Sequence, residues 1–187
     1  MKDWKKILII ACLSALSAEL YWNIFSSSFR ISLAVILLPI LLMTLGKNLS
    51  SVTTCFVTAC VVLLSRSFLA GSGIADATNL LLLLLPNAAF YVTYGIVFSI
   101  FVPNKYIFSY KQIFPALFAS DWLSNIVELC IFELYQPGSF TIQRLGVLAV
   151  VALFRSLLSC LFLIAEAQYR ILLKKEEHDN RYRRLFL

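Results

Sequence analysis

Apolar residues occur in six long runs, separated by short stretches rich in Lys, Gly, Ser and Asn. Crossing the roughly 30 Å hydrocarbon core of a bilayer takes about 20 apolar residues in a helix, which is close to the length of these runs. The predicted spans are residues 5–25, 30–46, 51–70, 79–102, 112–135 and 142–170. We therefore predict an all-α integral membrane protein, a bundle of six transmembrane helices formed by residues 1–173.

Two of these runs carry residues that shape helix packing. Pro39 lies inside the second run, where it removes one backbone hydrogen bond, so we expect a kink whose freed carbonyl finds a neighbouring donor. Ala11, Ala15 and Ala18 share one face of the first helix. Such a stripe of small residues lets another helix approach closely, and we interpret it as a packing surface.

The last run continues as a charged helix, because no Gly or Pro interrupts residues 168–187. From residue 142 onward this would be one rod of roughly 70 Å, longer than a membrane requires. Ile171, His178 and Leu185 are spaced seven apart, a weak coiled-coil seam that favours a homodimer through this helix. We expect residues 171–187 to be a truncated cytoplasmic helical linker of a longer protein.

A polar stripe interrupts the fifth run. Asp121, Ser124, Asn125 and Glu128 are spaced i, i+3, i+4 and i+7, so a helix places them on one face. An ionisable group at membrane depth costs about 2.5 to 3.5 kcal/mol on insertion scales and persists where it faces a bundle interior, a partner charge or water. Two interpretations follow, a structural ion pair or ligand binding, and the pattern alone does not separate them.

One ion pair can be predicted by counting. The turn at residues 136–139 joins the fifth and sixth helices, and counting outward from it places Arg155 at the depth of Asp121. We predict that Asp121 and Arg155 form a structural ion pair. Removing either partner of such a buried pair would cost about 3 to 5 kcal/mol.

The fourth run has a polar and aromatic face of its own. Asn87, Tyr91 and Tyr94 are spaced i, i+4 and i+7 in the fourth run, although tyrosines also serve as packing residues and interface anchors. The predicted ligand-binding residues are Glu19, Arg66, Asn87, Tyr91, Tyr94, Asn125 and Glu128. Carboxylates suit an ammonium group and an arginine suits a carboxylate, so a zwitterionic amino acid would fit this set.

Composition supports the membrane assignment. The 187 residues are 60% hydrophobic and only 14% charged, outside the usual range of soluble domains. Twelve of the 16 Lys and Arg residues fall on one side of the predicted topology, and Arg30, Arg66 and Arg144 fall on the other. The positive-inside rule thus predicts a multi-pass protein of the cell membrane with both termini cytoplasmic. The net charge of +6 is explained by this asymmetry and by anionic lipid, and it makes no case for nucleic acid.

The sequence contains no catalytic pattern. There is no Gly-rich phosphate loop, no nucleophile elbow and no histidine within an apolar run. All five cysteines lie in apolar runs without metal-ligand spacing, so we expect neither a metal site nor a cofactor.

Three short motifs resemble those of a known family. They are RISL at residues 30–33, FYVTYG at 90–95, and DWLSNIVE at 121–128. They resemble the N-terminal membrane region of Gram-positive sensor histidine kinases, the glutamine-sensing type among them. The resemblance implies that the bundle senses a small solute for a two-component system, while a kinase core after Leu187 would phosphorylate a response regulator. His178 and Asp179 resemble a phosphoacceptor pair but lack its downstream pattern, so we interpret them as ordinary linker positions.

A second resemblance belongs to a different class. The chain has six predicted helices in under 190 residues, both ends inside, and the segment from Ala11 to Ala15 in the first helix. These features are similar to the substrate-binding component of energy-coupling factor transporters for vitamins, in which a small-xxx-small first helix meets the coupling subunit. We predict a sensory input module that binds a small polar solute within the bilayer and signals through its last helix. The alternative is a substrate-binding component that takes up a vitamin-like molecule.

Overall fold

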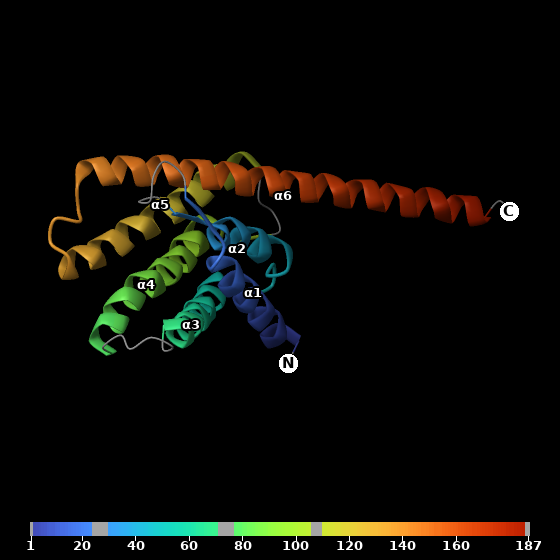
Figure 1. The fold of residues 1–187 in the computed structure, drawn as a ribbon. Helices are drawn as coiled ribbons and strands as arrows, with labels where there is room; N and C mark the ends of the chain where they lie inside the picture. The colour runs from blue at the N-terminus through green and yellow to red at the C-terminus, as the bar shows by residue number, and fades with distance from the viewer. Residues whose placement is uncertain (1, 24–29, 71–76, 106–109, 186–187) are drawn as a thin grey trace.

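The computed structural model describes residues 2–23, 30–70, 77–105 and 110–185. Over these residues the chain forms six helices and one pair of three-residue strands (Figure 1). The elements are α1 (Lys2–Ala18), β1 (Tyr21–Asn23), β2 (Arg30–Ser32), α2 (Leu33–Thr44), α3 (Ser51–Ala70), α4 (Ala77–Phe101), α5 (Tyr110–Tyr135) and α6 (Ile142–Leu185). The predicted helical architecture is therefore confirmed, with a strand pair that the sequence did not predict.

The strand pair shortens the first two helices relative to the predicted ranges 5–25 and 30–46. β1 and β2 are antiparallel, with Trp22 opposite Ile31, and aromatic and β-branched residues of this kind favour extended backbone. Ser32 then begins α2 as its N-cap, since its side chain accepts a hydrogen bond from the backbone N–H of Ala34. Glu19 consequently follows the end of α1 instead of lying within the helix.

Membrane-spanning capacity differs among the helices. Three of those in the described part of the chain are long and apolar enough to cross a bilayer, through the stretches Ser51–Phe68, Leu84–Phe101 and Ile142–Leu173. α2 is apolar but has 12 residues, about 18 Å of helix, which is shorter than the hydrocarbon core. These helices fit a membrane protein, and six crossings remain a prediction.

The centre of the bundle is a close contact between α3 and α4. A Cβ atom on Gly95 would lie 2.6 Å from the Cβ of Cys55 and 3.1 Å from the carbonyl oxygen of Ser51. A side chain at position 95 would therefore force the two helices apart. Thr54 and Thr58, buried on the same face of α3, donate their hydroxyls back to carbonyls one turn earlier, so no polar group of theirs is left to disturb this contact.

The small face of α1 is used inside the bundle. Ala11, Ala15 and Ala18 are buried, as are Ser14 and Ser17 beside them, and α1 contacts both α2 and α3. The alanine stripe is interpreted from the sequence as a packing surface for another helix. In the structure, the helices that it packs against belong to this chain.

α6 connects the bundle to the C-terminal end. Its 44 residues measure about 66 Å at 1.5 Å per residue, and its C-terminal half extends beyond the other helices (Figure 1). Its N-terminal half contacts α5 and α2, where Ser159 Oγ donates to the carbonyl oxygen of Ile36 at 3.2 Å, within the turn that precedes Pro39. The side chains of His178 and Leu185 lie outside those that the structure describes.

Candidate functional site

Asp121 on α5 and Arg155 on α6 form the ion pair that the helix register predicts. Arg155 Nη1 donates to Asp121 Oδ1 at 3.2 Å, and the two side chains are only 8% and 2% exposed. The two helices follow each other in the sequence and run antiparallel, joined by a short turn. The pair thus brings opposite charges together across neighbouring helices. It therefore joins α5 to α6 in the interior of the bundle.

Asn125 completes this network from the next turn of α5. Its amide nitrogen donates to the backbone oxygen of Asp121 at 2.6 Å and to Oδ1 at 2.7 Å. Asp121 Oδ1 thus accepts two hydrogen bonds, whereas Oδ2 is buried without a hydrogen-bond partner among the described residues. A buried carboxylate oxygen without a donor is costly, and such an atom is often where a ligand or water donates.

Glu128 lies seven residues further along the same face of α5. Its side chain is half-buried, and within the described part of the chain it makes no hydrogen bond or ion pair. The charges of Arg155, Arg66 and Asp121 nevertheless act on it electrostatically. Glu128 is accordingly a carboxylate inside a charged cluster without a direct partner among the described residues.

Glu19 and Arg66, predicted as separate ligand contacts, contact each other. Arg66 Nε donates to Glu19 Oε1 at 3.3 Å, with side chains 30% and 40% exposed respectively. Arg66 also acts electrostatically on Glu128 and on Tyr91. Arg66 therefore bonds to the residue that follows α1 and lies within electrostatic range of the charged face of α5.

Two tyrosines on one face of α4 lie near the charged residues of α3, α5 and α6. Tyr91 and Tyr94 are both buried; Tyr94 stacks on Phe98 with ring centroids 6.0 Å apart, and Tyr91 meets Phe90 edge-on at 5.4 Å. Tyr91 lies within the electrostatic reach of Arg66, Glu128 and Arg155, and Tyr94 within that of Asp121. The tyrosines both pack the core and border the charges. Asn87, one turn before Tyr91, is half-buried.

Sequence reasoning missed the serines that flank Arg155 on α6. Ser156 and Ser159 are buried, and the hydroxyl of Ser156 has no hydrogen-bond partner among the described side chains. Ala152, Arg155 and Ser159 are spaced i, i+3 and i+7, so they lie on one face of a helix. The same helical spacing applied to the residues around Arg155 would therefore have identified Ser159 from the sequence. This face is the surface that α6 presents to the bundle.

The described residues contain no group of three or more His, Cys, Asp or Glu placed to hold a metal ion. The arrangement offers two kinds of contact instead. Glu128 and Asp121 Oδ2 can accept hydrogen bonds from a cationic or amide group, and Arg66 can donate to a carboxylate. Comparison of the chain with protein-family models, with curated proteins and with solved structures finds no match.

Proposed function

We propose that this protein is a membrane-embedded sensory input module that binds a small zwitterionic solute, such as an amino acid, between α3, α4, α5 and α6. The observation that carries the proposal is a half-buried carboxylate, Glu128, with no direct partner, close to a second buried carboxylate whose Oδ2 is also unbonded in the described structure. Ionisable groups at this depth point to function.

The ligand's two charges would be recognised by different helices. Its ammonium group would donate to Glu128, and its carboxylate would accept from Arg66, which is held by the exposed Glu19 in the solute-free protein. Glu19 and the ligand carboxylate would compete for the same guanidinium. The tyrosines of α4 would form the apolar wall that excludes water from these contacts.

The signal would leave through α6, because Arg155 is the point at which the charged cluster touches this helix. A ligand shifts a two-state equilibrium only through different affinities for the two states. Movement of α5 on ligand binding would be transmitted to α6 by the Asp121–Arg155 pair. The 44-residue helix then connects this contact to the C-terminal segment.

The burial of Ala11 and Ala15 weighs against the transporter alternative. In that class the small face of the first helix meets a separate coupling subunit, whereas here it contacts α2 and α3 of the same chain. The length of α6 beyond the bundle also favours a signalling protein.

The proposal is tested by ligand-dependent stability. The purified full chain in detergent would be unfolded thermally with each of the common amino acids. One that binds at 100 times its Kd stabilises the fold by about 2.7 kcal/mol and raises the unfolding temperature accordingly.

Glu128→Gln should abolish that rise while leaving the solute-free unfolding temperature nearly unchanged. Glu166→Gln is the matched control, since it removes the same charge from a residue that pairs with Arg170 on α6. If no amino acid raises the unfolding temperature, or if the rise survives Glu128→Gln, the proposed site is wrong.

A further inference from the structure

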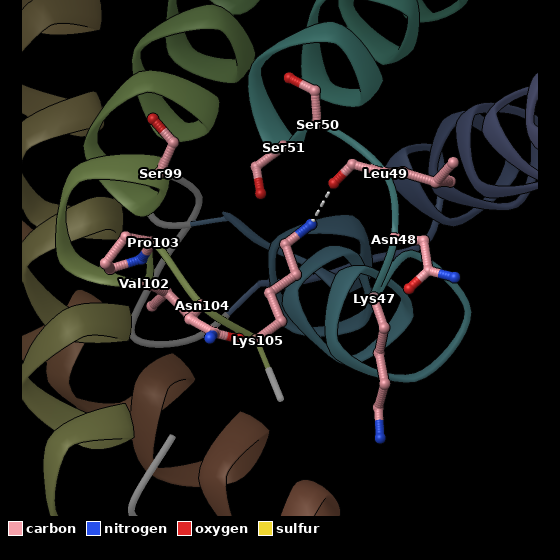
Figure 2. A pocket seen from close by; sticks show the side chains of 10 residues that line it. All are labelled: Lys47, Asn48, Leu49, Ser50, Ser51, Ser99, Val102, Pro103, Asn104 and Lys105. Atoms are coloured by element: carbon pink, nitrogen blue, oxygen red, sulfur yellow. Dashed lines mark hydrogen bonds between the residues drawn. The ribbon is translucent and has the colours of Figure 1, made fainter. Parts of the chain in front are cut away.

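A second polar region lies at the opposite end of α3 from Arg66, where α3 begins and α4 ends. A hollow of about 350 Å³ opens there between the turn before α3 and the segment after α4. Figure 2 shows that Lys105 and Ser51 point toward each other across it from different segments, while Ser99 lines its α4 side. Among the described residues its lining includes a second lysine, Lys47, whose side chain extends away from Lys105, and no Asp or Glu. The hollow is therefore electropositive.

Lys105 is the unusual residue of this hollow. Its side chain is only 8% exposed, and Nζ donates to the carbonyl oxygens of Gly46 at 2.9 Å and Leu49 at 2.7 Å. An ammonium group has three donors, and no carboxylate lies within ion-pair distance of this one among the described residues. Burial lowers the pKa of Lys105, as expected for a cation removed from water without a counter-ion.

The start of α3 adds further donors. Ser50 caps the helix, since its hydroxyl accepts from the N–H of Thr53 at 3.3 Å. The remaining N–H groups of a first helical turn have no intrahelical acceptor, and the helix dipole is positive at this end. The Ser99 hydroxyl is donated to the carbonyl oxygen of Ile96 at 2.7 Å, so Ser51 is the serine that can donate into the hollow. A tetrahedral anion there would thus meet a buried ammonium, the Ser51 hydroxyl and a helix N-terminus.

The position of the hollow indicates where such an anion comes from. The apolar stretch of α3 begins at Ser51 and that of α4 ends at Phe101, so the hollow lies where two membrane-spanning candidates reach the bilayer surface. Phe101 and Val52 are exposed next to it and can contact acyl chains. Lys47 and Lys105 belong to the twelve basic residues that the positive-inside rule predicts to be cytoplasmic, on the side where anionic lipids are concentrated.

We propose that this hollow is a binding site for the phosphate group of an anionic membrane lipid, with Lys105 as its counter-ion. The lipid would tie the α2–α3 turn to the end of α4 and so stabilise this end of the bundle. The site is independent of the solute site among α3 to α6.

The test is a lipid titration of the purified full chain in an uncharged detergent, monitored by native mass spectrometry and by unfolding temperature. Phosphatidylglycerol should remain bound and raise the unfolding temperature, whereas phosphatidylcholine should do neither. Lys105→Gln should weaken phosphatidylglycerol binding roughly tenfold to a hundredfold, as expected for loss of a charge-assisted hydrogen bond. Lys6→Gln, which removes an exposed lysine of α1, should leave it unchanged.

Because Lys105 also bonds two carbonyls, Lys105→Gln can fail to fold for that reason alone. Ser99→Leu gives a second route, since a leucine at this partly exposed position fills the hollow and leaves Lys105 in place. It should reduce phosphatidylglycerol binding by at least tenfold in protein of normal stability. Equal binding of both lipids, binding unaffected by Ser99→Leu, or equal stabilisation by millimolar inorganic phosphate would each overturn the lipid assignment.

Discussion

Two arginine–carboxylate pairs in this bundle have nearly the same geometry and very different surroundings. Arg155 and Asp121 are 3.2 Å apart in the interior, while Arg66 and Glu19 are 3.3 Å apart where α1 and α3 end. The first pair is almost fully buried and is joined by Asn125. The second is partly exposed and joins two helices that are distant in sequence.

Exposure decides what each pair can do. A buried pair cannot separate without leaving an uncompensated charge in the interior, which makes it a fixed link between α5 and α6. An exposed pair contributes little net stability, because water and salt compete for both groups. Arg66 can therefore exchange Glu19 for a ligand carboxylate at small cost, whereas Arg155 cannot exchange Asp121.

Breaking the buried pair should have the largest effect. Asp121→Asn leaves Arg155 charged in the interior, and we expect a loss of about 3 to 5 kcal/mol in the free energy of unfolding. Chemical unfolding in mixed micelles measures this loss. The double variant Asp121→Leu, Arg155→Met removes both charges and should recover most of it. An Asp121→Asn protein as stable as the parent would show that the pair does not hold the helices.

The buried face of α1 gives the next largest effect. Ala15→Leu places a large side chain between α1 and its neighbours, and overpacking of this kind costs about 1 to 3 kcal/mol. Leu16→Ala, at an exposed position of the same helix, is the control and should be nearly neutral in the same unfolding assay. Full stability of Ala15→Leu would mean that this face is free for another subunit, as the transporter alternative requires.

Breaking the exposed pair should affect stability least. Glu19→Gln should change the free energy of unfolding by no more than about 1 kcal/mol, because the pair is solvent-screened. It should also tighten binding of the zwitterionic solute, since Glu19 no longer competes for Arg66. Isothermal titration with whichever amino acid stabilises the parent protein measures this. Weaker binding in Glu19→Gln would assign Glu19 to the ligand rather than to Arg66.

Features set by helical periodicity or by a short connection could be predicted from the sequence. The 3.6-residue period placed Asp121, Asn125 and Glu128 on one face, and the short turn before α6 fixed Arg155 opposite Asp121. The absence of Gly and Pro from residues 168–187 predicted the continuous helix, which the structure contains as far as Leu185.

Features that depend on distant contacts were not predictable in this way. Glu19 and Arg66 are 47 residues apart, and their pairing follows from the packing of α1 on α3. Lys105 entered the prediction only as one of the twelve basic residues on the cytoplasmic side. Its burial could not be predicted, because it depends on the α2–α3 turn folding over it. The β1–β2 pair replaced predicted helix because aromatic and β-branched residues such as Trp22 and Ile31 suit both a membrane helix and an extended strand.

The rotational phase of α6 tests the central claim most directly. In a full chain fused after Leu187 to a histidine kinase core, phosphorylation would be measured with one or seven residues inserted near Lys174. Side chains advance about 100° per residue, so one added residue should lock kinase output on or off. Seven, close to two full turns, should restore the response to solute. Unchanged output with every insertion, together with vitamin uptake that depends on Ala15, would contradict the sensor and favour the transporter.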